Sequence, residues 1–566
     1  MQLPIKDRSP IEKEWVIAPK VPNDVILDLN EYSPIMQQLL YNRGITNPTA
    51  AAHFFQIEAN SHNPFLLKGI QNAVERIINA IQIQEKIAVF GDYDADGITA
   101  TALLTEVLSV LGAKVMPYIP EREEGYGVNT NAIDYLHESG VSLVITVDCG
   151  IRSPNELKYA QSLGMTVIIT DHHVPGDVIP AVYSVICPRV EGDEYPEKNL
   201  SGVGLAYKLA QALFLSIEGS SEKAEDWLDL AAIGTVADVV PLLGENRLIV
   251  TKGLKNIRFT HRLGLLSLIK IAGLNEKKIN TFDISFGIAP RLNAAGRLDS
   301  PIKALELLMT SDPVKAGLLV QELDDINRRR QKETIDMQEF AQSTIDENRM
   351  IIVAMHKDFN SGLVGLVSAK LTDFYYRPSI VGHMGKEYTR ASCRSIPEFH
   401  ITHALDQCDD LLIRHGGHAM AAGFTIANDK IEYLLDRLEK IAQLRLSIKD
   451  LQPKINVDME YPLHLLPKNI LNDLEKLEPL GAENSEAVFV SRGVLVKHAR
   501  TVGKDENHLK MVLRDNGIEY DAIAFNQGYW GKVMPPRIDL TYSIERNFYN
   551  GNIYTQLRVK DIKSSQ

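Results

Sequence analysis

The stretch IAVFGDYDADGITATALLTEVL, residues 87–108, decides the fold. It begins as an apolar run, breaks at Gly91 into three aspartates at alternate positions, and continues after Gly97 as a helical pattern. A buried strand followed by a tight turn and a helix is the first unit of a parallel α/β sheet. The stretch therefore predicts an α/β domain that carries Asp92, Asp94 and Asp96 at the end of a strand.

The same rhythm continues to about residue 188, with the further apolar runs VMPYIP, LVITVD, TVIITD and SVICP. Ligands of such sheets bind beyond the carboxyl ends of the strands, and Asp148 and the triplet Asp171-His172-His173 fall there. Hard cations take oxygen ligands, and an imidazole shifts the preference from Mg²⁺ toward Mn²⁺. We therefore predict a divalent-metal site. Because adjacent side chains of an extended segment point to opposite sides, one histidine should face the metals and the other a phosphate.

The segment DYDADG also matches the first half of a calcium-binding loop, D-x-D-x-D-G. However, Leu103 fills the glutamate position of that pattern, and a strand rather than a helix precedes Asp92. Aspartates that only cap the following helix would explain one carboxylate but not three. Gly97 instead places a helix N-terminus beside the carboxylates, where its amides could receive a phosphate oxygen. Metal binding is the favoured interpretation.

Composition indicates a globular protein of several domains. The 566 residues predict about three to five domains, at roughly 100 to 200 residues each. No apolar stretch approaches the ~20 residues of a membrane span, and the start MQLPIKDRSP shows no secretory pattern, so we expect a cytoplasmic protein. Its four cysteines form no CxxC pair and are expected to be reduced thiols. A net charge of −13 argues against indiscriminate coating of nucleic acid, but not against a local basic channel.

Beyond the first lobe, the pattern of apolar and polar residues along the chain changes three times. A helix-prone stretch without Pro or Gly after Gly317 predicts one connecting helix over residues 313–348. Residues 349–450 read as a second α/β lobe, and residues 451–566 as short strands of a small β-barrel. Ten of the chain's 39 aromatic residues lie in this last segment, interleaved with Lys and Arg. They would stack bases or, equally well, fill the core of the barrel.

The motifs GDYDADG, VDCG, TDHH and GTVADVVPL, in that order, resemble those of the DHH phosphoesterase superfamily. RLNAAGRLDSP at 291–301, ASCRS at 391–395 and GGHAMAAG at 416–423 are similar to motifs of the RecJ single-strand-specific exonucleases. The resemblance covers nearly the whole chain. It implies a DHH catalytic domain over residues 61–312, preceded by an N-terminal segment (1–60) that packs on the core.

The resemblance also names the remaining parts and the activity. It implies a DHH-associated domain over residues 349–450 and an oligonucleotide-binding (OB) fold over residues 451–566. The implied activity is removal of 5′-mononucleotides from single-stranded DNA in the 5′ to 3′ direction, in DNA repair and recombination. The implied cofactors are two Mn²⁺ or Mg²⁺ ions.

Carried over residue by residue, the resemblance supplies a ligand set for the two ions. The implied ligands are Asp94, Asp96, Asp148, His172 and Asp238, with Asp148 bridging the ions. Asp92 is expected as a further ligand or as a residue that contacts the ligands. Some relatives have a histidine at the position of Phe90, and Asp92 would take the place of that histidine here. The expected catalytic groups are Asp148 and His173, and His173 would neutralise a phosphate oxygen or protonate the leaving group.

Several other side chains are suited to bind a 5′-phosphate. The resemblance implies phosphate contacts by Arg122, Ser392 and Arg394; without it, each arginine reads as a surface ion pair. His418 is expected to contact a nucleotide. In the alternative interpretation, the glycines of its motif only allow a turn to pack tightly. The remaining candidates, for the path of the DNA or equally for anchoring a loop to the core, are Arg291 and Arg297.

One motif departs from the pattern. In LEPLGAENSEAVF, residues 477–489, Glu483-Asn484-Ser485 stand where RecJ proteins typically show a Gly-Asn-Pro turn. The departure leaves the metal ligands untouched and concerns the local geometry that joins the barrel to the core.

Two other functions remain open. A DHH-type phosphodiesterase of short oligonucleotides or cyclic dinucleotides would generally lack a long C-terminal barrel. A catalytically inactive replication scaffold would not need the full set of ligand candidates. The expected partners of the exonuclease are single-stranded DNA, a single-strand-binding protein and a repair helicase, and we expect a monomer without membrane contact.

Overall fold

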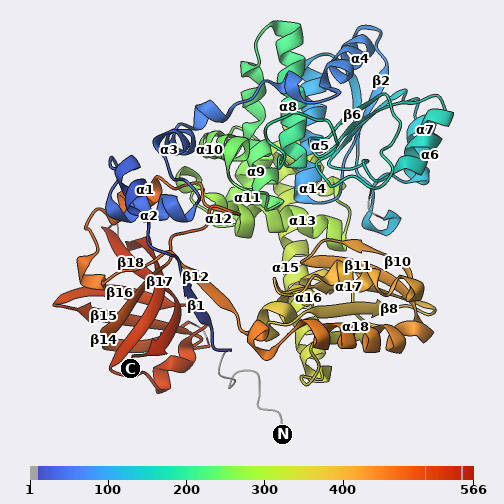
Figure 1. Ribbon diagram of the computed structural model, residues 1–566. Helices are drawn as coiled ribbons and strands as arrows, with labels where there is room; N and C mark the ends of the chain where they lie inside the picture. The colour runs from blue at the N-terminus through green and yellow to red at the C-terminus, as the bar shows by residue number, and fades with distance from the viewer. Residues whose placement is uncertain (1–10, 126, 504, 550–551, 566) are drawn as a thin grey trace. The chain divides into compact units, whose positions relative to one another are not determined.

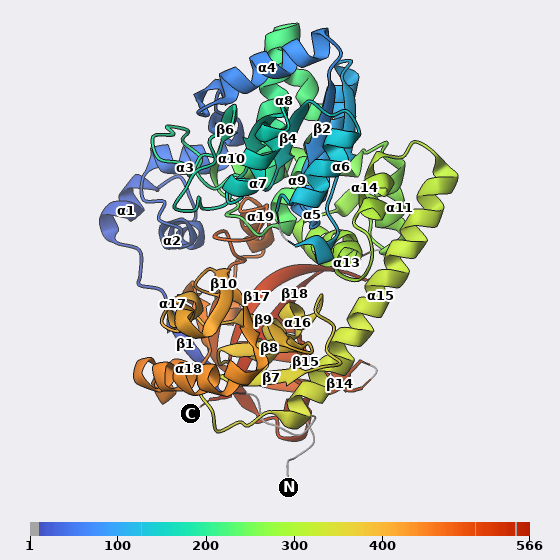
Figure 2. The ribbon, with the colours of Figure 1, turned by 90° about the vertical axis from the view of Figure 1, so that its right-hand side faces the viewer.

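The computed structural model describes residues 11–125, 127–503, 505–549 and 552–565, and the chain forms two compact units. Unit 1 comprises residues 1–52, 334–478 and 486–566, and unit 2 comprises residues 53–333 and 479–485. The predicted connecting helix is α15 (Pro313–Thr344), which is long and uninterrupted (Figure 2) and ends four residues before the expected boundary at 348. In the part of the chain that the structure describes, no helix is both long and apolar enough to cross a membrane.

Unit 2 is built on a five-stranded sheet in which all neighbouring strands run parallel (Figure 1). Its order is β3-β2-β4-β5-β6. The bounds are β2 (Lys86–Phe90), β3 (Lys114–Tyr118), β4 (Leu143–Val147), β5 (Thr166–Thr170) and β6 (Ser184–Ile186). The chain moves from β2 outward to β3 and then returns to the other side of β2 as β4, so the strand order switches direction between β2 and β4. Ligands of open α/β sheets bind at such a switch point.

Both faces of this sheet are buried, which explains why its strands are almost continuously apolar. Ile87 and Val89 of β2 pack into one core cluster, whereas Ala88 and Phe90 pack into a second cluster on the opposite face. The first cluster includes residues of α4 (Ile70–Gln82), α5 (Ala95–Val110), α8 (Gly202–Glu218) and α9 (Leu228–Ala237). The second includes residues of α6 (Thr130–Glu138) and α7 (Pro154–Ser162). The predicted α/β class is confirmed.

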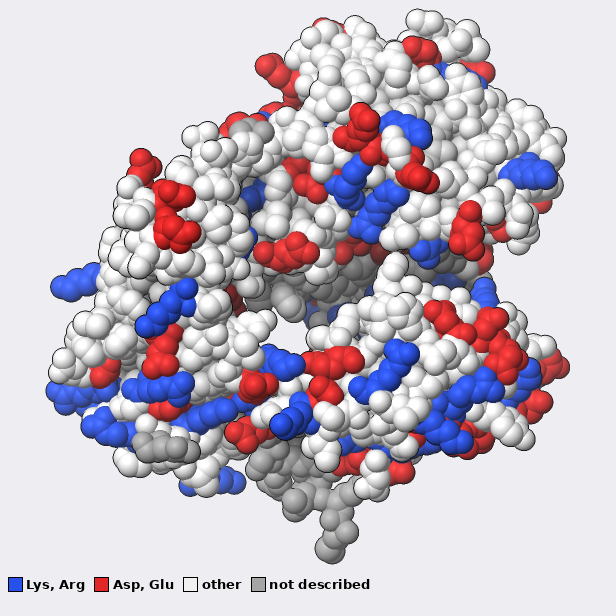
Figure 3. Space-filling view, viewed as in Figure 1, with Lys and Arg blue, Asp and Glu red and all other residues white. Residues whose placement is uncertain are grey.

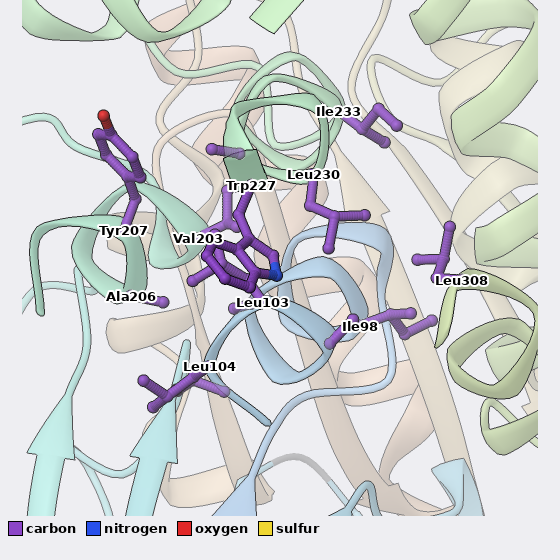
Figure 4. Close-up of a cluster of buried hydrophobic side chains, with 14 of the residues drawn as sticks. Ile98, Leu103, Leu104, Val203, Ala206, Tyr207, Trp227, Leu230, Ile233 and Leu308 are labelled. Carbon is purple, nitrogen blue, oxygen red and sulfur yellow. The ribbon is translucent and has the colours of Figure 1, made fainter. Parts of the chain in front are cut away.

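The larger of the two clusters fixes the helices that carry the carboxylates. Leu103 and Leu104 of α5 lie beside Val203 and Ala206 of α8, and Ile98 of α5 belongs to the same cluster (Figure 4). Leu230 and Ile233 of α9 and Leu308 of α14 (Ile302–Met309) complete this packing. Further helices of the unit are α10 (Gly244–Arg258), α11 (Leu263–Ile271), α12 (Thr281–Asp283) and α13 (Ala289–Leu298).

Unit 1 contains a second five-stranded sheet, in the order β10-β11-β9-β8-β7. Only β7 and β8 are parallel, and the other pairs are antiparallel. The bounds are β7 (Ile352–His356), β8 (Ser379–Met384), β9 (Tyr388–Arg394), β10 (Leu412–Gly417) and β11 (Ala421–Ala427). The helices of this part are α16 (Val364–Tyr375), α17 (Ile401–Asp406) and α18 (Ile431–Arg445).

The C-terminal strands of unit 1 close into a barrel, because β14 pairs with both β15 and β17. The bounds are β12 (Lys454–Val457), β13 (Met459–Glu460), β14 (Phe489–Val502), β15 (His508–Asp515), β16 (Ile518–Ala524), β17 (Arg537–Tyr549) and β18 (Asn552–Ser564). Phe489 and Tyr542 fill the barrel core, whereas Phe525 and Tyr554 are 47% and 46% exposed. Core filling thus accounts for some of the aromatics, and base stacking stays a prediction for the exposed ones.

The first described residues of the chain, from residue 11 onward, belong to unit 1. Strand β1 (Glu14–Ile17) pairs in parallel with β12, and the Trp15 indole donates a hydrogen bond to Asp561 (2.8 Å). Helices α1 (Asn23–Asp28) and α2 (Pro34–Asn42) follow. The expected N-terminal segment, residues 1–60, is therefore divided, since residues up to 52 cluster with unit 1.

Candidate metal centre

The turn between β2 and α5 places three carboxylates at the switch point of the unit 2 sheet. Asp94 is the N-cap of α5, and its carboxylate accepts hydrogen bonds from the amides of Asp96 (3.0 Å) and Gly97 (3.1 Å). A Cβ at Gly97 would lie 2.6 Å from the backbone nitrogen of Asp92, so the turn requires glycine there. Asp92 and Asp96 are buried, at 3% and 1% exposure.

Asp148 follows β4 directly and has a left-handed backbone, with φ of 61°. A non-glycine residue in this region is strained, and such strain is common at functional sites because the surrounding structure enforces it. Here the amide of Asp148 donates to the Thr170 carbonyl (3.0 Å), and Gly202 packs against the side chain, where a Cβ would lie 2.5 Å away. The structure thus holds the Asp148 carboxylate in place from two sides.

The triplet 171–173 follows the end of β5, where the backbone is no longer extended in a ladder. The two imidazole rings therefore do not point to opposite sides, as the sequence led us to expect, but lie with their centroids 4.5 Å apart. His172 is buried, whereas the side chain of His173 is 31% exposed and its Nδ1 lies 2.8 Å from Asp171. Asp171 also accepts a hydrogen bond from the Ile151 amide (2.9 Å) and so acts as an anchor of the turn.

The carboxylates and His172 converge. His172 Nε2 lies 3.1 Å from Asp148 Oδ1, 3.6 Å from Asp238 Oδ2 and 4.0 Å from Asp96 Oδ2. Three groups each have their ligand atoms within 4.8 Å of one another: Asp92, Asp94 and Asp148; Asp96, His172 and Asp238; and Asp148, His172 and His173. Asp148 and His172 each take part in two of these groups. The bridging role that the resemblance implies for Asp148 stays a prediction.

Burial and mutual repulsion shift the pKa values of this cluster. Burial raises the pKa of Asp96 to about 7 and that of Asp238 to about 9, and neighbouring carboxylates add to both shifts. The pKa values of Asp92 and Asp148 are raised well above the ordinary range for the same two reasons. Burial lowers the pKa of His172 to about 3, so this imidazole is neutral and can donate a lone pair.

This donor set fits a pair of hard or borderline divalent cations. Among the described residues, the buried atoms Asp92 Oδ1, Asp148 Oδ1 and His172 Nε2 have no hydrogen-bond partner, since the last two lie 3.1 Å apart without the alignment of a hydrogen bond. Buried polar atoms without a partner are costly, and so many carboxylates at one place repel one another unless cations neutralise them. Oxygen ligands with one imidazole suit Mn²⁺ or Mg²⁺.

Three predicted arginines lie in unit 2, in different surroundings. The guanidinium of Arg122 lies over the ring of Tyr93, 5.0 Å from its centroid. Burial, followed by the charges of Arg122 and Arg330, lowers the pKa of Arg297 to about 10, which indicates that these cations lie near one another. Arg291, in contrast, forms an ion pair with the buried Asp324 (2.8 Å) and donates to the Gly287 carbonyl (2.6 Å). These contacts match the anchoring role that the sequence left open for Arg291.

The other predicted residues lie in unit 1. Ser392 and Arg394 stand on β9, and the guanidinium of Arg394 donates to Ser392 Oγ (3.2 Å). Gly365, in the first turn of α16, faces them, since a Cβ there would lie 3.1 Å from Ser392 Oγ. His418 lies in the tight turn between β10 and β11 and is exposed. Gly417 has φ of 148°, and a Cβ there would lie 2.3 Å from the Ala421 carbonyl, so that glycine serves the turn.

The sequence did not reveal the backbone groups that hold the ligands. Asp96 accepts hydrogen bonds from the amides of Gly202 (2.7 Å) and Val203 (2.8 Å), and the Ala95 amide donates to Asn293 Oδ1 (2.8 Å). Gly202 was not among the residues singled out in the sequence, and Asn293 lies inside the quoted RLNAAGRLDSP motif without a role assigned to it. No local sequence pattern predicts such contacts, because the two residues of each hydrogen bond are about 100 or more positions apart in the chain.

Comparisons with known proteins agree with this architecture. Residues 86–235 match the DHH family N-terminal domain, residues 347–444 the DHHA1 domain, and residues 457–561 the RecJ OB domain. The single-stranded-DNA-specific exonuclease RecJ of Bacillus subtilis is 38% identical over 94% of this chain and 68% of its own length. RecJ of Escherichia coli is 32% identical over 94% of this chain and 96% of its own length.

A solved structure matches nearly the whole chain. The crystal structure of Thermus thermophilus RecJ in complex with Mn²⁺ has a TM-score of 0.85 and 30% identity, and the match covers 98% of this chain and 80% of that one. The three domain matches, the identity over nearly the full length and the structural likeness point to one family. The chain belongs to the RecJ family of single-stranded-DNA-specific exonucleases.

Proposed function

We propose that this protein degrades single-stranded DNA from its 5′ end, releasing 5′-mononucleotides in the 5′ to 3′ direction, in DNA repair and recombination. Membership of the RecJ family supports the activity. The observation that carries the proposal is the convergence of Asp148, His172 and the other ligand candidates at the switch point of the unit 2 sheet. In this proposal the residues that hold two ions are Asp92, Asp94, Asp96, Asp148, His172 and Asp238.

Two divalent ions in such a site activate water, polarise the phosphoryl group and stabilise the leaving oxygen. The chain's own contribution is to hold the ligands before substrate arrives. Asp148 is fixed by the hydrogen bond from its amide to the Thr170 carbonyl and by the close packing of Gly202, and Asp96 is fixed by two backbone amides. A rigid set of ligands of this kind does not have to reorganise during the reaction.

His173 is suited to meet a phosphate. Burial disfavours the charged ring, but the hydrogen bond and charge of Asp171 outweigh burial and raise the pKa of His173. The ring is therefore more readily protonated than a free imidazole, and part of it faces solvent beside Asp148 (3.9 Å). In the proposed reaction His173 neutralises a phosphate oxygen or donates a proton to the departing 3′ oxygen.

The preference for a 5′ end is assigned to Ser392 and Arg394. The Arg394 guanidinium is held by Ser392 Oγ and by the Cys393 carbonyl (2.8 Å), and Gly365 brings the N-terminus of α16 close to both. Arg394 is half-buried, and this burial lowers the pKa of its guanidinium. A partly desolvated guanidinium beside a helix N-terminus suits a terminal phosphate dianion better than an internal diester.

Arg122 and Arg297 are assigned to the DNA backbone near the metal centre. Their charges lie close enough to influence each other, and a phosphate oxygen nearby would favour the charged form of both. His418 is retained as a nucleotide contact, and Arg291 as a contact on the DNA path, although its ion pair with Asp324 also anchors α13.

Binding of DNA in this protein has to be local. The net charge is −13, and on the face seen in Figure 3 acidic and basic side chains are interspersed. Specific cations such as Arg122 and Arg394, rather than a uniformly basic surface, would then contact the strand. Single-stranded DNA is the partner that the proposal requires. A single-strand-binding protein, a repair helicase, the monomeric state and the cytoplasmic location stay predictions.

The direct test is digestion of single strands labelled at the 5′ or the 3′ end, with Mn²⁺ or Mg²⁺, followed by sizing of the products. We expect 5′-labelled strands to release labelled mononucleotide at once, and 3′-labelled strands to shorten progressively. Asp148→Ala should abolish cleavage while DNA binding persists, and Asp134→Ala, which removes an exposed carboxylate of the same unit, should not. Undiminished cleavage by folded Asp148→Ala protein would refute the site. A preference for dinucleotides over long strands would favour the phosphodiesterase alternative.

A further inference from the structure

The loop that follows Asp238 is strained. Asp238 is the C-cap of α9, and the next residue, Val239, has a left-handed backbone with φ of 60°. This conformation is strained for a β-branched residue. The Val239 side chain is 70% exposed, so its own packing does not hold it there. Other contacts must therefore keep the loop in the conformation that presents Asp238.

One such contact is Asn246, which is fully buried at the start of α10. Helix α10 packs beside α9 (Figure 1). The Asn246 amide donates to the Pro241 carbonyl (3.1 Å) and to the Asn199 carbonyl (2.6 Å). Pro241 lies three residues after Asp238, and Asn199 lies three residues before Gly202, whose amide holds Asp96. A single side chain therefore ties together the two loops that position Asp238 and Asp96.

The second contact comes from a distant segment, the turn formed by residues 479–485. The backbones of Gly481 and Asn484 exchange hydrogen bonds (2.9 and 3.2 Å), and the buried Asn484 side chain donates to the Pro479 carbonyl (2.9 Å). The Ala482 carbonyl accepts a hydrogen bond from the Leu242 amide (2.9 Å), four residues after Asp238. This turn therefore holds the far end of the strained loop.

Two further side chains of unit 2 hold the turn in place. Thr281 donates to the Leu480 carbonyl (2.6 Å), and Arg247 donates to the Pro479 carbonyl (3.3 Å). Gly481 packs so closely that a Cβ would lie 2.5 Å from Leu242 Cδ1. The turn belongs by sequence to the region that matches the RecJ OB domain, yet it clusters with unit 2.

We propose that Asn246 and the turn 479–485 are positioning elements of the metal centre, which hold Asp238 in its strained loop at the spacing from Asp96 that metal binding requires. This inference rests on the proposed two-metal function. A segment of the OB region then supports the metal centre, so a substitution in the turn should displace Asp238.

The test is the affinity of metal-free, full-length protein for Mn²⁺, measured by calorimetry without DNA. Loss of a group that orients metal ligands typically weakens metal binding about 10- to 100-fold. Asn246→Ala should weaken it about tenfold or more. The matched control is Asn256→Ala on the same helix, which removes a similar bond to the Glu225 carbonyl (2.7 Å) and should leave the affinity unchanged.

The turn is tested by Gly481→Ala, whose new methyl group would push against Leu242. It should weaken Mn²⁺ binding severalfold, whereas Gly317→Ala, at a helical glycine with open space around it, should not. The sharpest test is rescue. In the Asn246→Ala background, Val239→Gly relieves the strained backbone, so part of the lost Mn²⁺ affinity should return.

Unchanged affinity in both Asn246→Ala and Gly481→Ala, with folding verified by thermal unfolding, would overturn the proposal. So would an equal loss in Asn256→Ala, because the effect would then follow from general destabilisation. Asp148→Ala separates this outcome from failure of the proposed function. If Asp148→Ala loses Mn²⁺ affinity and Asn246→Ala keeps it, the metal centre stands and only the positioning role falls.

Discussion

Substituting Gly202 by alanine tests whether Asp148 is held where the geometry places it. A Cβ at residue 202 would lie 2.5 to 2.6 Å from the Cβ, Cγ and Oδ1 atoms of Asp148, whereas ordinary contacts begin at 3.4 Å. The Asp148 side chain must therefore withdraw by about 0.9 Å. A misplacement of roughly 1 Å at a reacting centre costs about 10²-fold in rate, which corresponds to about 2.7 kcal/mol of activation free energy.

The assay is the rate of mononucleotide release from 5′-labelled single strands at saturating Mn²⁺. We expect Gly202→Ala to reduce kcat by about 10²-fold and to weaken Mn²⁺ binding, while the protein stays folded because alanine favours the first turn of α8. Gly204→Ala is the matched control on the same helix, since its Cβ would meet Ser201 Oγ at 3.1 Å and two Leu200 side-chain atoms at 3.5 and 3.6 Å, and none of these atoms belongs to a metal-ligand candidate. Wild-type rate and affinity in Gly202→Ala would refute the reasoning that Gly202 fixes Asp148.

Three further predictions concern charge and backbone strain. In metal-free protein, burial raises the pKa of Asp96 to about 7 and that of Asp238 to about 9. Between the unfolded and the folded pKa values the folded state binds more protons than the unfolded state. The free energy of unfolding should therefore fall as pH rises from about 4 to about 9. Urea unfolding at several pH values should show this fall. If the free energy of unfolding depended on pH in the same way in Asp238→Asn, the prediction would be contradicted. Arg394→Ala should reduce the preference for 5′-phosphorylated over 5′-hydroxyl ends about tenfold or more, because a hydrogen bond to a charged group contributes about 1.5–3 kcal/mol; paired KM measurements on the two ends check this, and equal loss on both would argue against the role. Glu483 has φ of 56°, a conformation that glycine adopts without strain, so Glu483→Gly should raise the free energy of unfolding by about 0.5–1 kcal/mol. A lower free energy of unfolding, measured with denaturant, would show that the Glu483 side chain contributes more stability than the strain costs.

The parts of the fold that depend on local pattern could be predicted from the sequence. The apolar run before Gly91 predicted a buried parallel strand, and the structure shows β2 buried on both faces. The stretch without Pro or Gly after Gly317 predicted one connecting helix, which is α15. Three aspartates at a strand end indicated a metal site, and Asp94 proves also to cap α5, so the capping explanation holds for one of the three.

What escaped prediction depends on contacts between distant residues. Asp238 was assigned only through the resemblance, because an aspartate at the end of a helix is common and its partners, Asp96 and His172, lie far away in the chain. The two histidine rings lie together because the backbone leaves the extended conformation after Thr170. The turn 479–485 looked like a joint of the barrel, and its packing against Leu242 could not be inferred from its sequence.

The central claim is that separated acidic groups and one imidazole together bind two cations. Crystals soaked in MnCl₂ and measured at the manganese absorption edge test it most directly, because anomalous scattering reports both the number and the place of the ions. The account predicts two peaks enclosed by the carboxylates of Asp92, Asp94, Asp96, Asp148 and Asp238 and by His172, with Asp148 between them. Peaks elsewhere, or none within this cluster, would contradict it.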